Sequence, residues 1–454
     1  MKNMNIYGKK VLVMGLGLHG GGVAVIQWLL KHGAKVTVTD LKTEKELQTS
    51  LDKLRNLKVR YILGRHRAED FKKTDILVQS PAVPNNSKYL KIAQKSGVEI
   101  ENDASLFFKH CKGLIIGVTG TRGKSTTSTL IYELLKTKTK KVYLAGLSQK
   151  PEMEILDKIR QGDLAVLELS SWQLEILGKE KLSPHVAVIT NVYPDHLNRY
   201  SGMDSYIKAK KNIFENQTRS DFAILNLGNP ETKKIGKTVL ARRFWFSQKY
   251  FSEQNGCFVK NGKIIFRHDG KETELAKAPE KNLENLLAAL TVAGVAKVSP
   301  AKIKTVLRKP IVLPGRMESI RTVNGIKYIN DTTATTPEAT MMALKTLKSK
   351  VILIAGGADK GLSFKVLAGE LARQCQTLVL LEGVGTEKIK KELKLYDIRL
   401  PVAEVKNMPD AIGVAQSFAK KGDTILLSPA CASFGMFVNE FDRGDKFVKI
   451  VENL

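Results

Sequence analysis

The sequence predicts an α/β protein of three domains, each built around a mostly parallel sheet. The length of 454 residues corresponds to about three domains at roughly 150 residues each. Short apolar runs at 11–14, 36–40 and 76–78 indicate strands, and the stretch at 23–30 indicates a helix. Strand, turn, helix and strand at this spacing are typical of a doubly wound sheet, so we expect a Rossmann-like domain over 1–103.

The same alternation continues beyond the first hundred residues. Five further apolar runs indicate strands, at 114–118, 164–167, 186–189, 351–355 and 424–427. The apolar spacing of 283–296 indicates a helix, and two prolines separate that helix from the last α/β pattern. We therefore expect a central domain resembling P-loop ATPases over 104–312 and a C-terminal Rossmann-like domain over 313–454.

The composition excludes several classes of protein. A hydrophobic content of 43% is enough for several cores, which excludes a wholly disordered chain. No apolar run approaches the roughly 18–20 residues that span a bilayer, and 1–14 is expected to be a first strand and not a signal peptide. The four cysteines form no C-x-x-C pair, which fits a reducing compartment. We expect a cytoplasmic protein with no membrane span, and the absence of an obvious association helix favours a monomer.

The charge of the chain is strongly positive, since Lys and Arg exceed Asp and Glu by 28. A positive charge of this size is compatible with a nucleic-acid partner. However, the lysines are dispersed, and no zinc finger, basic tail or basic stripe with interleaved aromatics occurs. We therefore interpret the charge as solvated surface and expect no nucleic-acid partner.

The most specific motif is a glycine-rich turn that follows the apolar run 114–118. Glycines let the backbone form a nest of N–H groups around phosphate oxygens. Within it, Lys124 can reach the β- and γ-phosphates, and the Ser125 hydroxyl can bind Mg²⁺. Val118 departs from the strict G-x-x-x-x-G-K-[ST] pattern, and a turn that only caps a helix is the alternative. We predict that ATP contacts Gly120, Thr121, Arg122, Gly123, Lys124, Ser125 and Thr126.

A second glycine-rich turn lies near the start of the chain. It reads Gly15-Leu16-Gly17-Leu18-His19-Gly20, and Asp40 ends the next expected strand. This arrangement favours a nucleotide diphosphate at the N-terminus of the following helix. The motif alone leaves NAD, a UDP-linked sugar and a purely structural turn open.

Acidic and histidine side chains follow strands in the central region. Glu168 follows the run 164–167, and His196 follows the run 186–189 with Asp195 beside it. Ligands gather at the carboxyl ends of strands in open α/β sheets. We therefore predict Glu168 and His196 as Mg²⁺ ligands beside the phosphate loop, with a structural histidine as the alternative for His196.

Taken together, the motifs resemble those of the Mur ligase family, the ATP-dependent enzymes that form the amide bonds of the peptidoglycan stem peptide. The matching segments run through the whole chain: Gly15-Leu16-Gly17, 119–126, 168–175, Asn191, Asp195-His196, Lys210, Asn282, Asn285, Arg316, Asn330-Asp331, 356–361 and 428–433. The E-L-S-S-W-Q-L-E and S-P-A-C-A-S-F strings are most similar to the family members that add D-glutamate.

The resemblance implies two chemical steps and a set of binding residues. ATP would phosphorylate the carboxylate of UDP-N-acetylmuramoyl-L-alanine, and the amine of D-glutamate would then attack the acyl phosphate. By motif match, Lys124 would stabilise the transferring phosphoryl group, and two Mg²⁺ ions would be bound by Ser125, Glu168, His196 and Lys210. Further contacts would be made with ATP by Asn282, Asn285, Arg316 and Asp331, with the uridine nucleotide by Gly17, Leu18, His19 and Asp40, and with D-glutamate by Thr335, Lys360 and Ser433.

Lys210 is expected to be carbamylated, because the family converts a lysine at this place into an anionic oxygen ligand. CO₂ reacts only with the neutral amine, so the site must lower the pKa of this lysine. Chemistry alone does not choose among Lys208, Lys210 and Lys211, and the surrounding frame selects Lys210 by similarity. Without the resemblance, we would expect all three lysines to lie on the solvated face of a helix.

Four positions depart from the family pattern. They are Leu147 and Thr333, in place of a substrate-contacting asparagine and a lysine, and Lys281 and Glu440, in place of a histidine and an aromatic residue. Two alternatives stay open, and the departures at Leu147 and Thr333 motivate the second of them. One is a ligase that resembles folylpolyglutamate synthetase, and the other is a nucleotide-binding regulator without catalysis.

Overall fold

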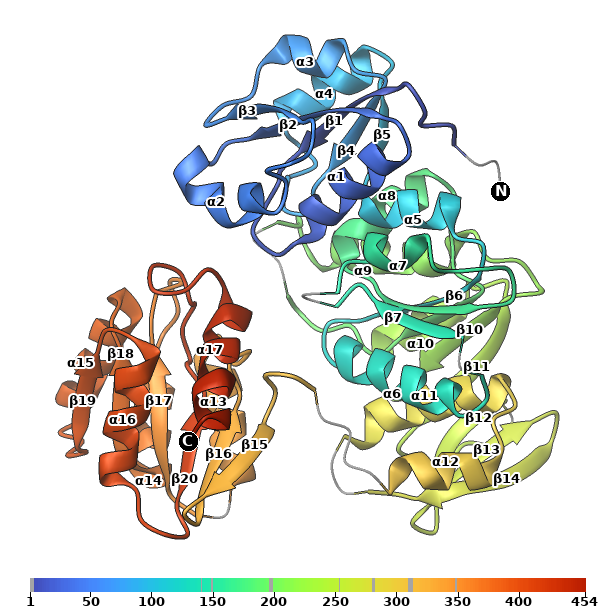
Figure 1. Cartoon of the computed structure of the whole chain (residues 1–454). Helices are drawn as coiled ribbons and strands as arrows, with labels where there is room; N and C mark the ends of the chain where they lie inside the picture. Colours follow the sequence, from blue (N-terminus) through green and yellow to red (C-terminus); the bar gives the residue numbers. More distant parts are fainter. Residues whose placement is uncertain are drawn as a thin grey trace. The chain divides into compact units, whose positions relative to one another are not determined.

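The structure is a computed structural model (Figure 1). It describes residues 4–139, 141–147, 150–195, 199–252, 254–279, 282–308, 313–347 and 349–454. The chain divides into two compact units, Met1–Ile311 and Val312–Leu454. Three sheets, two in the first unit and one in the second, confirm the predicted α/β class.

The first sheet is fully parallel, with the order β3-β2-β1-β4-β5. Its elements are β1 (Lys10–Met14), α1 (Gly21–Lys31), β2 (Lys35–Asp40), α2 (Glu44–Asp52), β3 (Arg60–Leu63), α3 (Ala68–Lys72), β4 (Ile76–Gln79), α4 (Lys88–Lys95), β5 (Glu99–Glu101) and α5 (Asp103–His110). Alternate residues of β1 face two different cores, since Leu12 packs with Phe71 while Val13 packs with Ile26. The predicted Rossmann-like domain is therefore confirmed.

The second sheet has nine strands, in the order β14-β13-β12-β11-β10-β9-β6-β8-β7. The first part comprises β6 (Leu114–Thr119), α6 (Lys124–Lys136), β7 (Val142–Ala145), α7 (Met153–Leu156), β8 (Leu164–Glu168), α8 (Ser171–Lys179), β9 (Val186–Ile189) and α9 (Met203–Glu215). The second part comprises β10 (Phe222–Asn226), α10 (Pro230–Gly236), β11 (Arg242–Ser247), β12 (Gly256–Lys260), β13 (Lys263–His268), β14 (Lys271–Lys277), α11 (Leu283–Val295) and α12 (Pro300–Leu307). Strands β6 to β12 pair in parallel, and only β13 and β14 pair antiparallel.

Two tight hairpins make the antiparallel end of this sheet. Asn261-Gly262 joins β12 to β13, and Asp269-Gly270 joins β13 to β14. All four residues have positive φ, between 49° and 78°, which is the backbone of the favoured two-residue hairpin turn.

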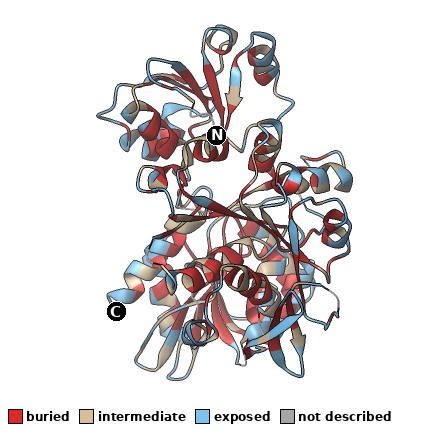
Figure 2. Ribbon diagram, turned by 90° about the vertical axis from the view of Figure 1, so that its right-hand side faces the viewer, coloured by how far each residue is buried: buried red, intermediate tan, exposed pale blue. Residues whose placement is uncertain are grey.

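The third sheet forms the core of the second unit, with the order β15-β16-β20-β17-β18-β19 and one antiparallel edge strand, β15. Its elements are β15 (Glu318–Val323), β16 (Ile326–Asn330), α13 (Pro337–Thr346), β17 (Val351–Gly356), α14 (Lys365–Gln374), β18 (Cys375–Leu381), α15 (Val384–Leu395), β19 (Val402–Val405), α16 (Met408–Phe418), β20 (Thr424–Leu427) and α17 (Glu440–Glu452). As Figure 2 shows, buried residues concentrate in the strands of the sheets and on the helix faces against them. The expected boundaries at 103 and 312 stay predictions.

None of the helices among the described residues has both the length and the apolar character that a membrane crossing requires.

Arg443 is a buried structural residue of the second unit, fully enclosed at 0% exposure. Its guanidinium donates to the Thr332 hydroxyl at 3.1 Å, the Thr332 carbonyl at 2.9 Å and the Cys431 carbonyl at 3.2 Å. Burial lowers the pKa of Arg443 to about 10. These bonds tie α17 to the loops that follow β16 and β20.

Replacing Arg443 with alanine should therefore destabilise the second unit by about 3–5 kcal/mol, because a cavity opens and two carbonyls and a hydroxyl lose their donor. Thermal unfolding followed by circular dichroism measures this as a lower Tm. The control is Arg399→Ala, whose side chain is 89% exposed and should change stability by less than about 0.5 kcal/mol. Equal Tm values for the two variants would contradict the structural role.

Candidate active site

The phosphate loop connects the end of β6 to the start of α6, and two of its glycines have no room for a side chain. A Cβ on Gly120 would lie 1.9 Å from the Thr190 hydroxyl oxygen, and one on Gly123 would lie 2.1 Å from Asn285 Oδ1. Gly123 also has a φ of 82°, in the left-handed region that favours glycine. Glycine is therefore required at both positions, because the loop packs directly against Thr190 and Asn285 at the N-terminus of α6.

Residues that follow β9 hold this loop in place. The Asn191 carbonyl accepts from the Thr121 N–H at 2.9 Å, and its side-chain oxygen accepts from the Arg122 N–H at 2.9 Å. Thr190 donates its hydroxyl to the Arg122 carbonyl at 2.7 Å. The loop is thus fixed before any ligand arrives. Sequence reasoning placed Asn191 after its strand but did not foresee this role.

Lys124 and Lys210 converge on one carbonyl oxygen of the phosphate loop. Lys124 Nζ donates to the Gly120 carbonyl at 3.2 Å and to the Thr121 carbonyl at 3.4 Å. Lys210 Nζ, carried by α9, donates to the same Gly120 carbonyl at 3.0 Å and lies 4.6 Å from the centre of the Tyr206 ring. Two lysine side chains that are 86 residues apart in sequence therefore meet at the loop.

Lys210 differs from its two neighbouring lysines in burial. Its exposed fraction is 2%, whereas Lys208 is exposed and Lys211 forms an ion pair with Glu215. Burial, reinforced by the nearby charge of Lys124, lowers the pKa of Lys210 to about 7. An amine with this pKa is largely neutral at slightly alkaline pH, which is the form that reacts with CO₂.

Glu168 ends β8, and one of its carboxylate oxygens is buried without a hydrogen-bond partner within the described residues. A buried carboxylate oxygen without a donor is costly unless a ligand completes it. The negative charge of Glu168 partly opposes the lowering of the pKa of Lys210, so the two side chains lie near each other. The Glu168 carboxylate and the Ser125 hydroxyl are oxygen ligands of the kind that Mg²⁺ prefers. The predicted ligand His196 lies outside the described residues, as does Lys281.

Asn282 and Asn285 lie at the start of α11. Asn282 precedes the helix with a φ of 55°, and Asn285 lies against Gly123, where Thr127 donates to its Oδ1 at 3.5 Å. Asn285 therefore contacts the phosphate loop itself. Its predicted adenine contact stays a prediction.

The first glycine turn lines a cleft of about 350 Å³ together with residues between β7 and α7 and residues of α8. Gly17, Leu18 and His19 belong to the lining, and Asp40 does not. Instead, Asp40 Oδ2 accepts from the backbone N–H of Leu16 at 2.8 Å, and its Oδ1 accepts from the Lys42 N–H at 2.9 Å. Asp40 thus holds the turn in shape, and its predicted nucleotide contact stays untested.

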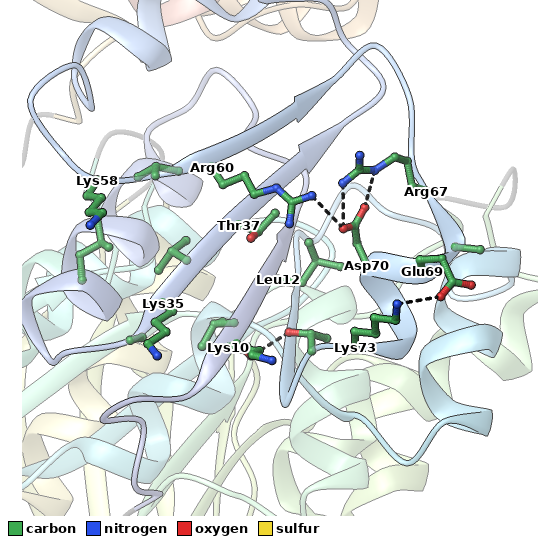
Figure 3. Close-up of a pocket in the computed structure, with 17 residues that line it drawn as sticks. Lys10, Leu12, Lys35, Thr37, Lys58, Arg60, Arg67, Glu69, Asp70 and Lys73 are labelled. Atoms are coloured by element: carbon green, nitrogen blue, oxygen red, sulfur yellow. Dashed lines mark hydrogen bonds and ion pairs between the residues drawn. The ribbon is translucent and has the colours of Figure 1, made fainter.

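A second cavity, larger than this cleft, opens at another edge of the first sheet (Figure 3). Its volume is about 1170 Å³, and it opens where β1, β2 and β3 begin, around Lys10, Lys35 and Arg60. The glycine turn follows the opposite, carboxyl end of β1. None of the predicted site residues lines this cavity, so its size does not locate the active site.

In the second unit, two of the three residues predicted to bind D-glutamate are in contact. Lys360 Nζ donates to the Thr335 hydroxyl at 3.1 Å, and burial lowers the pKa of Lys360 while Glu440 opposes this shift. Ser433 is buried, with its carbonyl accepting from the Phe437 N–H at 3.1 Å.

Asp331 is the buried acid of this unit. It accepts from the Ser428 hydroxyl at 2.7 Å and from the Met317 N–H at 3.1 Å. Burial raises the pKa of Asp331 to about 6, and the exposed Arg316 partly opposes this. The ATP contacts predicted for Arg316 and Asp331 stay predictions.

Family models match all three regions of the chain. They describe a MurD-like N-terminal domain at residues 9–102, a Mur ligase middle domain at 118–293 and a Mur ligase glutamate ligase domain at 315–431. The chain therefore belongs to the Mur ligase family, as its motifs indicated.

Relatives named UDP-N-acetylmuramoylalanine--D-glutamate ligase match the chain from end to end. The protein from Roseiflexus sp. (strain RS-1) is 40% identical over 99% of this chain and 100% of its own length. Those from Acetivibrio thermocellus and Borreliella afzelii are 36% and 37% identical, over 99% and 100% of this chain and 97% and 99% of their own lengths. Among solved structures, UDP-N-acetylmuramate-alanine ligase from Thermotoga maritima shares the fold, with a TM-score of 0.62, 20% identity and coverage of 98% and 99%.

Proposed function

We propose that this protein is the ATP-dependent ligase that joins D-glutamate to UDP-N-acetylmuramoyl-L-alanine. The observation that carries the proposal is identity of 33–40% over the full chain with eight relatives of that name. The convergence of Lys124 and Lys210 on the phosphate loop supports the ATP-dependent part of the reaction.

The reaction solves the problem that a carboxylate is a poor electrophile. A substrate carboxylate oxygen attacks the γ-phosphorus of ATP, the bond to the β-phosphate oxygen breaks, and ADP leaves. The amine of D-glutamate then attacks the acyl carbon, inorganic phosphate leaves and the amine loses a proton. Each step crowds negative oxygens together, and the Lys124 ammonium with the N–H groups of the loop lowers that repulsion.

The acidic and hydroxyl groups at the loop would hold magnesium. Ser125 and Glu168 would hold one ion, and His196 and carbamylated Lys210 would contribute to a second. When bound, Mg²⁺ neutralises phosphate charge. The carbamate would turn the buried amine of Lys210 into an anionic oxygen ligand. Burial and the charge of Lys124 favour the neutral amine that carbamylation needs.

Contacts to the substrates are proposed on the same basis. Gly17, Leu18 and His19 would contact the uridine nucleotide from the first glycine turn, and Thr335, Lys360 and Ser433 would bind D-glutamate in the second unit. We also propose that the enzyme acts in the cytoplasm as a monomer without a nucleic-acid partner. Size-exclusion chromatography with light scattering tests the monomer directly.

Phosphate release tests the function. The assay contains ATP, Mg²⁺, UDP-N-acetylmuramoyl-L-alanine and one amino acid from a panel. Release only with D-glutamate is the expected result. Release with another amino acid would overturn the assignment of the amine and keep the ligase mechanism. Release with none would favour the folate-type ligase, tested by exchanging the nucleotide-sugar for a folate, or the regulator without catalysis.

A further inference from the structure

Two acidic side chains line the cleft beside the first glycine turn, and the proposed mechanism uses neither. Asp103 begins α5, and Glu152 precedes α7. Glu152 is buried, with 4% of its surface exposed, and Asp103 is half-buried. Leu147 lines the same cleft. Its side chain cannot form a hydrogen bond, and an asparagine was expected at this position.

Gln173 holds both acids through one nitrogen. Its Oε1 accepts from the N–H and the hydroxyl of Ser170, both at 3.0 Å, so the N-terminus of α8 fixes which end of the amide faces the acids. Its Nε2 donates to Asp103 Oδ1 at 3.1 Å and to Glu152 Oε1 at 3.0 Å. Because the amide nitrogen has two hydrogens, both of its donors are used.

Within the described residues, this pair of acids has no cationic partner. No ion pair to Asp103 or Glu152 occurs within the described parts of the chain, and no cation contributes to the pKa shift of either group. Burial raises the pKa of both acids, and the charge of Asp103 raises that of Glu152 further. Two carboxylates close together in a buried site cannot both stay ionised at low cost. Glu152 is therefore the acid that the site favours as a neutral group.

A neutral carboxyl in this cleft suits one part of the nucleotide-sugar better than the others. A carboxylate would repel the diphosphate, which the N–H groups at the start of α1 would attract. A neutral carboxyl both donates and accepts hydrogen bonds, so it matches the hydroxyl and acetamido groups of an N-acetylated amino sugar.

On these grounds, and resting on the proposed function, we propose that Glu152 contacts the sugar of the nucleotide-sugar substrate and determines specificity for it. Gln173 and Asp103 position the carboxyl of Glu152. In this chain Glu152 supplies the polar contact that Leu147 cannot make.

The test measures the binding of two ligands by calorimetry, UDP-N-acetylmuramoyl-L-alanine and UDP. Glu152→Ala should raise the Kd for the nucleotide-sugar by about 10–100-fold and leave the Kd for UDP unchanged, because UDP lacks the sugar. Glu152→Gln, which keeps a neutral donor and acceptor of the same size, should stay within about threefold of the wild type. The matched control is Glu154→Gln, an exposed glutamate of α7.

Kinetics and thermal unfolding separate binding from folding. In Glu152→Ala, the KM for the nucleotide-sugar should rise as its Kd does, while the KM for ATP and the Tm stay close to those of the wild type. An unchanged Kd for the nucleotide-sugar, or an equal loss of UDP binding, would overturn the role of Glu152. Failure of the proposed function is seen separately, as a wild-type enzyme that releases no phosphate with D-glutamate.

Discussion

Replacing Lys124 with alanine is expected to lower kcat by about 10²–10³-fold. Lys124 is held at the phosphate loop by the Gly120 and Thr121 carbonyls, at the N-terminus of α6. From there its ammonium can follow the charge that develops on the transferring phosphoryl group. Removing one fixed donor to such a charge costs about 3–4 kcal/mol of transition-state stabilisation.

The measurement is phosphate release at saturating substrate concentrations. Lys136→Ala is the matched control, because Lys136 lies at the other end of α6 and pairs with Glu133 on the surface. Its kcat should stay within about twofold of the wild type. A Lys124→Ala enzyme with more than a third of the wild-type kcat would show that this side chain does not act on the phosphoryl group.

The parallel strands could be predicted from the sequence because they are buried on both faces. Such strands appear as unbroken apolar runs, and the run at 424–427 coincides with β20. The run at 351–355 falls one residue short of β17, which ends at Gly356. The glycine-rich turns could also be predicted, because their backbone conformation and close packing require glycine.

The antiparallel end of the central sheet was not predicted, although its signal is present. Asn261-Gly262 and Asp269-Gly270 are the dipeptides that two-residue hairpins favour. Strand β14, KETELAK, is mostly polar, and β13, KIIFRH, has an apolar run of only three residues between charged ends. The two turn dipeptides would have predicted these strands, whereas the hydrophobic pattern did not.

The residues of the candidate site also differ in whether the local sequence could predict their roles. Lys124 could be placed from its local motif, because the motif itself forms the loop. Asp40 and Asn191 could be located but not explained, since their hydrogen-bond partners depend on how separate segments pack. The link from Gln173 to Glu152 joins residues 21 positions apart, and no local pattern encodes it.

Lys210→Met is expected to remove activity and, at the same time, to stabilise the protein. Activity should fall by at least about 100-fold, because methionine cannot form the carbamate that is proposed to bind the metal. Stability should rise, because a buried amine with a pKa of about 7 carries a penalty that methionine does not. A gain in stability with a loss of activity distinguishes a functional lysine from a structural one.

The stability effect has a defined pH dependence. An unfolded lysine has a pKa of about 10.4, so the folded state binds this proton less tightly than the unfolded state. Above about pH 10.4 both states are neutral at this site and the penalty is absent. It grows as the pH falls and is complete below about pH 7. The Tm advantage of Lys210→Met should therefore increase from pH 10 to pH 7, to several degrees.

Two measurements complete the test. The Tm is followed from pH 7 to 10 in CO₂-depleted buffer without Mg²⁺, with Lys208→Met as the control, because Lys208 is exposed on the same helix. Wild-type phosphate release is then compared in CO₂-depleted and bicarbonate-supplemented buffer at pH 8, where most of the Lys210 amine is neutral. Carbamylation requires higher activity with bicarbonate in the wild type and no response in Lys210→Met. Equal wild-type rates in the two buffers, with ¹³C-bicarbonate giving no carbamate signal by NMR, would exclude it.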